Sequence, residues 1–164
     1  MSEAAGEIEH PKLQRLLRYW NEKRDDRPMP ARGDIDPFDF PDLLPHVFLV
    51  DVSYDPLVFR FRLAGTEVNK LLGEEITGKT TEEIKAERLR PVLRKAYENV
   101  VRSRQPAAAT RTYEGHNRYL VYARLLLPLS ADGEVIDMLL GCMLWLSTHD
   151  LPPEKRGRRP DQIG

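Results

Sequence analysis

The stretch FRFRLAGTEVNKLLGEEITGKTTEEI, residues 59–84, decides the fold. It begins as a strand, because apolar residues from Phe59 to Leu63 alternate with arginines, and a period of two places the apolar set on one face. Thr66 is expected to cap a short helix, which Gly73 ends in the left-handed conformation. The sequence therefore predicts a strand that leads directly into a short helix.

A second helix start follows at once. Thr80 and Glu83 have the spacing of a capping box, in which each side chain satisfies a free backbone N–H at the start of a helix. Both predicted helices are too short to be stable alone, so they must be held against something larger. We expect them to form one wall of a pocket.

An amphipathic helix is predicted upstream, over residues 11–26. Its apolar stripe has helical spacing and consists of Leu13, Leu16, Leu17 and Trp20. The stripe either packs only on the chain's own sheet or docks against a second subunit as well, and one stripe does not distinguish the two. A proline-rich linker follows over residues 27–42, with at most one helical turn near Asp39.

The remaining segments predict an antiparallel sheet. A strand at 47–52 and the strand that starts at 59 form a hairpin around a turn at 54–56, with Asp51 paired to Arg60 or Arg62. The strongest helix covers 87–104 and should lie across the sheet, and three further strands cover 107–113, 119–129 and 135–147. Runs of strands on either side of helices predict an α+β fold: five antiparallel strands, helices on one face and an N-terminal amphipathic helix.

Composition limits the classes of function. The 164 residues are 41% hydrophobic, which suits a single domain at 10–149 between a disordered stretch at 1–9 and a flexible basic tail at 150–164. A net charge of −1 gives no general attraction to nucleic acid, and no apolar run is long enough to insert in a membrane. The single cysteine, Cys142, excludes an internal disulfide and suits the cytoplasm.

The junction described above resembles the first half of a PAS domain. The matching residues of this "AG-T-N" and "G-E-TG" pattern are Ala64, Gly65, Thr66, Asn69, Gly73, Glu75, Thr77 and Gly78. With the upstream segments RYW (18–20), RPMPARGDIDP (27–37) and DLLPHVFLVDV (42–52), the chain is similar to a bacterial branch of stand-alone PAS-like domains over roughly residues 10–148. The resemblance implies a sensor or regulatory fold and names no ligand or cofactor.

In PAS domains a small ligand lies between the sheet and the helices. The residues expected to line that space here are Phe59, Phe61, Leu63, Leu72, Ile84, Leu93, Tyr97, Tyr119 and Val121. An apolar lining with a few tyrosine hydroxyls would hold one ligand in a fixed orientation. The same residues would equally form a filled core with no ligand.

One motif competes with this interpretation. Gly73, Gly78, Lys79 and Thr80 satisfy the nucleotide-binding pattern G-x-x-x-x-G-K-[ST]. Such a loop must leave a buried strand and enter a long helix, whereas Gly73 follows a helical stripe. We therefore expect a helix end followed by a capped helix start, and nucleotide hydrolysis is a remote alternative.

No catalytic or metal-binding constellation emerges. The histidines, His10, His46, His116 and His149, have no spacing that aims two at one ion, and the residues that hold haem or flavin in PAS domains have no counterpart. We expect a sensory or regulatory module that binds a small ligand or a protein partner and acts on a separate signalling protein or as a homodimer. A small enzyme that uses the same pocket is the alternative.

Overall fold

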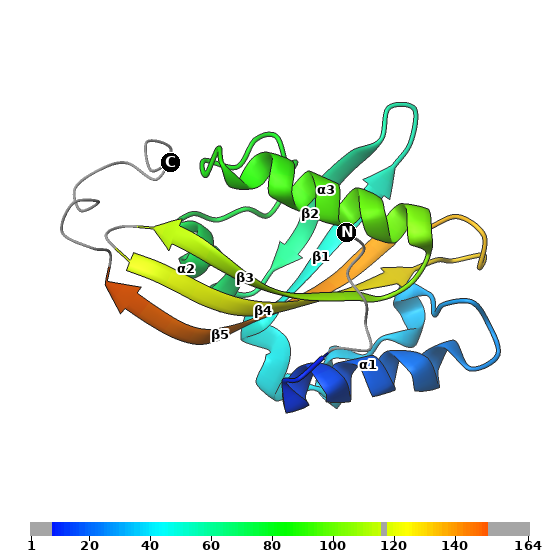
Figure 1. Ribbon diagram of the computed structural model, residues 1–164. Helices are drawn as coiled ribbons and strands as arrows, with labels where there is room; N and C mark the ends of the chain where they lie inside the picture. The colour runs from blue at the N-terminus through cyan, green and yellow to red at the C-terminus, as the bar shows by residue number, and fades with distance from the viewer. Residues whose placement is uncertain (1–7, 116–117, 151–164) are drawn as a thin grey trace.

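A computed structural model describes residues 8–115 and 118–150, and its centre is a five-stranded sheet (Figure 1). All paired strands are antiparallel, in the order β2-β1-β5-β4-β3. The strands are β1 (Val47–Ser53), β2 (Val58–Ala64), β3 (Ala107–Gly115), β4 (Arg118–Leu129) and β5 (Met138–Asp150). The helices are α1 (Pro11–Arg24), α2 (Thr66–Leu72) and α3 (Leu89–Ser103). The predicted α+β class is confirmed.

The helices cover both faces of the sheet. The long helix α3 lies across one face and α1 runs along the other (Figure 1). Helix α1 begins with Pro11 in the tolerated first position, and the His10 imidazole Nδ1 accepts the Lys12 N–H at 3.2 Å. Its residues Leu13, Leu16 and Trp20 are buried. The apolar stripe therefore packs on the sheet of its own chain, as both alternatives predicted.

Three 3-10 turns connect α1 to the sheet. They are η2 (Arg32–Asp34), η3 (Pro37–Asp39) and η4 (Pro41–His46). The prediction of at most one turn near Asp39 was wrong. Prolines explain the difference, because a fixed φ suits the first position of a tight turn and two of these turns begin at a proline.

The β1–β2 hairpin contains a β-bulge that changes which side chains face α3. The pairing steps from Leu49–Leu63 to Val50–Phe61, so Arg62 is an extra residue on β2. One extra residue reverses the alternation of faces. Phe61 is 1% exposed, whereas Leu63 is 50% exposed.

The segment 73–88 does not form the second helix that the sequence predicted. Thr80 N–H does donate to Glu83 Oε1, at 3.0 Å, yet only a turn follows. The backbone here bonds to β2 instead: Phe61 N–H donates to Lys79 O at 2.9 Å, and Gly78 N–H donates to Phe61 O at 2.6 Å. The segment therefore covers the outer edge of β2. Its backbone N–H and C=O groups that bond to β2 are not available for the hydrogen bonds of a helix.

The start of α2 also differs from the prediction. Gly65, not Thr66, is the N-cap, and its O accepts the Asn69 N–H at 3.1 Å. A Cβ on Gly65 would lie 2.3 Å from Pro45 O, so only glycine fits where the chain crosses η4. Gly73 ends the helix with φ 72°, as predicted.

The second half of the chain follows the prediction closely. Helix α3 ends at Ser103, and Arg104 takes the left-handed conformation at its C-cap. The turn between β4 and β5 contains Gly133 at φ 79°. The predicted disordered and flexible ends, residues 1–9 and 150–164, lie almost entirely outside the described residues.

Candidate functional site: the space between the sheet and α3

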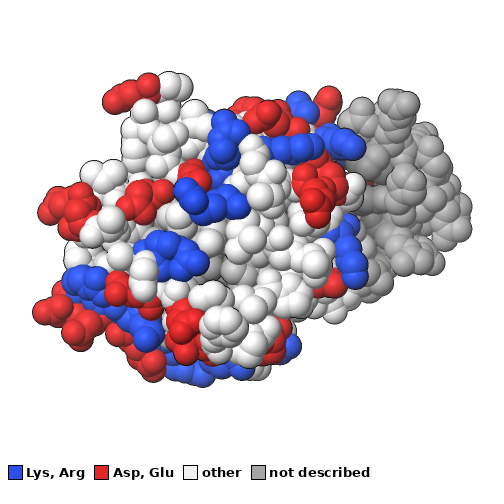
Figure 2. Space-filling view, turned by 180° about the vertical axis from the view of Figure 1, so that it is seen from behind, with Lys and Arg blue, Asp and Glu red and all other residues white. Residues whose placement is uncertain are grey.

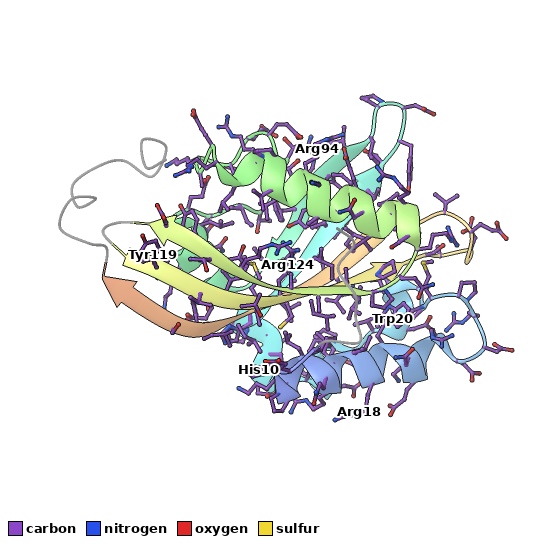
Figure 3. All side chains as sticks on the ribbon, in the orientation of Figure 1. His10, Arg18, Trp20, Arg94, Tyr119 and Arg124 are labelled. Carbon is purple, nitrogen blue, oxygen red and sulfur yellow. The ribbon has the colours of Figure 1, made fainter. Side chains whose placement is uncertain are left out.

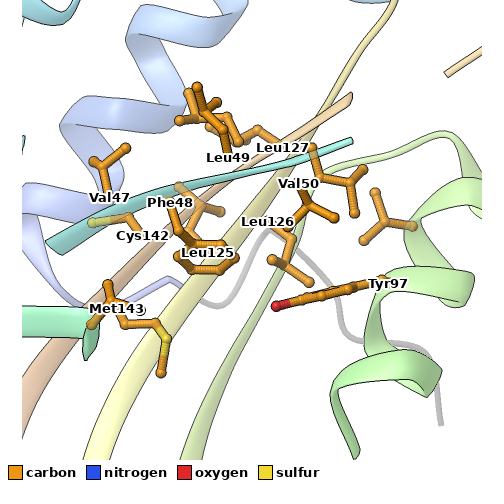
Figure 4. Close-up of a cluster of buried hydrophobic side chains, with 14 of the residues drawn as sticks. Val47, Phe48, Leu49, Val50, Tyr97, Leu125, Leu126, Leu127, Cys142 and Met143 are labelled. Atoms are coloured by element: carbon orange, nitrogen blue, oxygen red, sulfur yellow. The ribbon is translucent and has the colours of Figure 1, made fainter. Parts of the chain in front are cut away.

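Four aromatic rings form the centre of the layer between the sheet and α3. Phe48 comes from β1, Phe59 and Phe61 from β2, and Tyr97 from α3. The Tyr97 ring lies 5.5 Å from that of Phe59 and 6.2 Å from that of Phe61, both nearly edge to face. Such geometry is favourable for aromatic pairs. Figure 4 shows Tyr97 reaching from α3 over apolar side chains of the sheet.

The Tyr97 hydroxyl is buried, and the charge of Arg124 acts on it. The side chain is 1% exposed, and burial raises the pKa of Tyr97, while the nearby positive charge of Arg124 only partly opposes that rise. The hydroxyl is therefore a neutral hydrogen-bonding group at ordinary pH. It is not poised to act as a general base.

Arg124 brings a permanent charge to this layer. It belongs to β4 and its side chain is 0% exposed, between the sheet and α3 (Figure 3). A guanidinium stays protonated in proteins even when buried, so its charge acts on neighbouring groups. Sequence reasoning missed Arg124. The available signal was a single charged residue inside the apolar run 119–129.

The space itself is almost filled. A cavity of about 10 Å³ remains beside the aromatic rings. Its lining consists of Phe48, Phe61, Val68, Leu72, Ile76, Leu89, Leu93, Tyr97, Tyr122 and Met143. That volume corresponds to roughly one water molecule, so this conformation is closed to a larger ligand. The lining contains no Asp, Glu or His, which leaves no carboxylate–histidine pair for acid–base catalysis there.

The structure brings together six of the nine residues predicted to line the space. These are Phe59, Phe61, Leu72, Ile84, Leu93 and Tyr97, all buried. The other three lie elsewhere. Leu63 faces the opposite side of the sheet because of the bulge, and Tyr119 and Val121 share the strand alternation of Ala123 rather than that of Tyr122.

The α1 residues predicted to contact a second subunit are covered by the sheet of their own chain. Leu13, Leu16 and Trp20 are buried against the sheet, and Leu17 packs partly against the same core. The Trp20 indole Nε1 donates to Pro128 O at 2.9 Å, which ties α1 to β4 (Figure 3). A homodimer through this stripe would require α1 to leave the sheet.

The nucleotide-binding pattern has another role in the structure. Gly73 ends α2, and Lys79 Nζ donates to Glu74 Oε1. The backbone of residues 78–81 is bonded along β2, so no free N–H loop precedes a long helix. The predicted helix end is present at Gly73, whereas the predicted capped helix start at Thr80 is only a turn.

Metal and membrane sites were searched in the described part of the chain. Among residues 8–115 and 118–150, no group of three or more His, Cys, Asp or Glu is placed to hold a metal ion. Within the same ranges no helix has the length and apolar character needed to cross a membrane. His116 lies outside the described residues, as does the His149 side chain. Figure 2 shows acidic and basic side chains interspersed on the face it presents.

Comparison with known proteins agrees with this architecture. The PAS domain of BvgS from Bordetella pertussis matches with a TM-score of 0.54 and 16% identity over 67% of this chain and 85% of that chain. A light-oxygen-voltage domain studied with a flavin analogue matches with a TM-score of 0.50 and 12% identity, over 67% and 83%. The light-oxygen-voltage protein of Rhodobacter sphaeroides gives 0.48 and 15%, over 69% of each chain.

At these identities the structural matches show the fold alone. No curated protein matches the chain. A family model of the PAS domain matches residues 8–144, most of the sequence. The chain therefore belongs to the PAS domain family.

Proposed function

We propose that this chain is a sensory or regulatory module that binds a small ligand between the sheet and α3, and signals by changing protein–protein contacts. The observation that carries the proposal is the aromatic layer of a PAS domain, closed around a small, largely apolar cavity that two tyrosines, Tyr97 and Tyr122, also line. An apolar pocket with few polar groups suits recognition of a small molecule. The alternative of a small enzyme finds no support in a cavity lined without Asp, Glu or His.

Ligand entry would require one wall to move, because the cavity is closed. The segment 73–88 is the mobile candidate, since much of it has no regular secondary structure. It is held by backbone hydrogen bonds to β2 and by the ion pair between Glu74 and Lys79. A ligand that binds the open form better than the closed form would shift the population toward the open form.

The output would be a contact on the outside of the domain. Arg94 of α3 donates to Leu57 O at 2.9 Å and pairs with Glu82 at 3.1 Å. These contacts link α3 to the β1–β2 hairpin and to the segment 73–88, which forms the wall. A shift of the wall would therefore move α3 and the hairpin together. The receiver is a separate signalling protein or a second copy of the chain. The proposed compartment is the cytoplasm, which suits a chain whose one cysteine, Cys142, is free.

The test is native mass spectrometry of the freshly purified full chain. We expect an added mass that denaturation releases. Leu93→Trp would fill the cavity, and Val92→Trp, on the neighbouring exposed position, is the matched control. The adduct should be lost from Leu93→Trp and kept in Val92→Trp, provided that both variants melt cooperatively. A bare chain mass, or equal loss in both variants, would contradict interior ligand binding.

A further inference from the structure

The loop at residues 73–78 carries one buried side chain into the interior cavity. Ile76 is 0% exposed and lines that cavity together with Tyr97. The residues around Ile76 are exposed to solvent: Gly73, Glu75, Thr77 and Gly78. Only the thickness of this loop therefore separates the cavity from solvent at this point. We name residues 73–78 the plug loop, because Ile76 fills the cavity from this side.

The plug loop begins and ends with a glycine in the left-handed conformation. Gly73 has φ 72° and Gly78 has φ 88°, and a Cβ built on either residue would meet no described atom within 4 Å. Glycine adopts positive and negative φ about equally readily, so the backbone at both positions has more than one accessible conformation. The two glycines are therefore suitable hinges for the residues between them.

The chain on either side of the plug loop is anchored. Before the loop, α2 packs its apolar side into the core. After the loop, the backbone is bonded along β2: Phe61 N–H donates to Lys79 O at 2.9 Å, and Thr81 N–H donates to Phe59 O at 3.2 Å. Rotation at the hinges would therefore move the loop and leave both neighbouring segments in place.

Side chains close the plug loop. Ile76 N–H donates to Asn69 Oδ1 at 3.1 Å, and the Glu74 carboxylate accepts from Lys79 Nζ and from Lys85 N–H. On opening, these groups would exchange their partners for water, so each bond opposes opening only modestly. Burial of the Ile76 side chain adds the apolar contribution that holds the loop shut.

We propose that the plug loop is the gate of the interior cavity, and that a ligand binds there by placing an apolar group where the Ile76 side chain lies. The closed cavity measures about 10 Å³, so most of the space for a ligand must come from the withdrawal of Ile76. This limits the apolar group to about the size of benzene, which fits an apolar cavity of about 150 Å³. The ligand step rests on the proposed function, whereas the gate does not.

Hydrogen exchange of the unmodified full chain, without added ligand, tests the gate. The amides of Ile76 and Gly78 should have protection factors at least about tenfold below those of Phe61 and Thr81, and low concentrations of urea should leave them unchanged. Equal protection of the four amides would mean that the segment 73–88 opens as one unit or only with the whole domain. Either result would overturn the proposal.

Gly78→Ala should favour the open loop. A Cβ has room at this position, but φ 88° is unfavourable for alanine, so the protection factor of Ile76 should fall by about fivefold or more. Gly133→Ala is the matched control, because Gly133 has φ 79° in the turn between β4 and β5. It should leave the ratio of Ile76 protection to Thr81 protection unchanged. The same change of that ratio in both variants would contradict the gate.

Benzene serves as the probe for displacement of Ile76. In an NMR titration it should shift the amide signals of Leu72 and Leu93, which line the cavity. Ile76→Ala should bind benzene at least about tenfold more tightly than wild type, because no side chain has to leave. Ile84→Ala is the matched control, since Ile84 is also 0% exposed but is not a lining residue. Equal affinity in wild type and Ile76→Ala, or an equal gain in Ile84→Ala, would overturn the displacement.

The gate and the proposed function fail in different ways. A released adduct in the mass spectrum, with no local opening at Ile76, would refute the gate and keep the proposed function. Local opening at Ile76 with a bare chain mass would refute interior ligand binding and keep the gate. Because hydrogen exchange uses the unmodified chain, a variant that fails to fold does not remove the test.

Discussion

The ring of Phe48 occupies the space where any residue other than glycine at position 141 would place its side chain. Phe48 and Gly141 are direct partners in the pairing of β1 with β5. A Cβ built on Gly141 would lie 2.0 Å from Cζ of Phe48. The Phe48 ring is in turn 6.2 Å from Phe61 and 6.3 Å from Tyr97. The missing side chain at Gly141 therefore sets the position of the aromatic layer.

Gly141→Ala should displace this layer. We expect the free energy of unfolding to fall by about 2 kcal/mol, because an added methyl group overpacks a filled core. Urea denaturation measures the loss, and near-ultraviolet circular dichroism should report the changed environment of Tyr97. Gly33→Ala is the matched control, since a Cβ there meets nothing within 4 Å, and it should change stability by less than about 0.5 kcal/mol. Equal effects in the two variants would contradict this account.

Phe61 and Leu63 should respond very differently to truncation. Phe61→Ala removes a ring at the centre of the core and should cost about 4 kcal/mol of unfolding free energy. Leu63→Ala, at a half-exposed position beyond the bulge, should cost less than about 1 kcal/mol. Urea denaturation of both variants checks the ratio. A large loss in Leu63→Ala would show that β2 keeps one register along its whole length.

These two residues also show how far sequence carries the prediction of the fold. Alternation identified β2 and its buried Phe59 and Phe61, and the same kind of signal identified α1 and α3. Alternation assumes unbroken pairing, however, and the bulge that reverses it depends on the partner strand β1. Leu63 was therefore assigned to the wrong face.

The candidate site was predictable to a similar degree. Residues on helices and on β2 were found, because helical spacing marks the buried face of α3. Strand β4 is apolar on both faces, so alternation did not indicate which of its residues face α3. Tyr119 and Val121 were therefore chosen in place of Tyr122.

The hydrogen bond from Trp20 to Pro128 should contribute to the docking of α1. Trp20→Phe keeps an aromatic ring but leaves the buried Pro128 oxygen without this donor, so we expect a loss of about 2 kcal/mol in unfolding free energy. Arg18→Gln, an exposed position on the same helix, is the control and should be nearly neutral. Denaturant titration measures both. If the two variants match wild type, α1 is held by apolar contacts alone.

Glu74 should make stability depend on pH in the acid range. Burial alone would raise the pKa of Glu74, but hydrogen bonds from Lys79 Nζ and Lys85 N–H outweigh it and lower that pKa. A lowered pKa in the folded state means that the contribution is complete above the pKa of the unfolded chain and is lost as pH falls through the folded value. Glu74→Gln should therefore cost about 1–3 kcal/mol at neutral pH.

The difference between wild type and Glu74→Gln should narrow as the pH is lowered through the acid range. Urea denaturation at a series of pH values measures it. Glu75→Gln, the exposed neighbour, is the control and should follow wild type throughout. A gap that stays constant with pH would show that the loss in Glu74→Gln comes from packing and not from the charge of Glu74.

The thiol of Cys142 should be inert in the folded protein. Burial raises the pKa of Cys142 to about 12, and the side chain is 0% exposed, so both the thiolate and access to it are suppressed. A colorimetric thiol reagent at about pH 8 should find no reactive group in the native chain and one after unfolding in guanidinium chloride. Thr112→Cys, at an exposed position of β3, supplies the positive control and should react at once. Rapid labelling of Cys142 in the native chain would mean that β5 opens under native conditions, because the reagent has no other route to that sulfur.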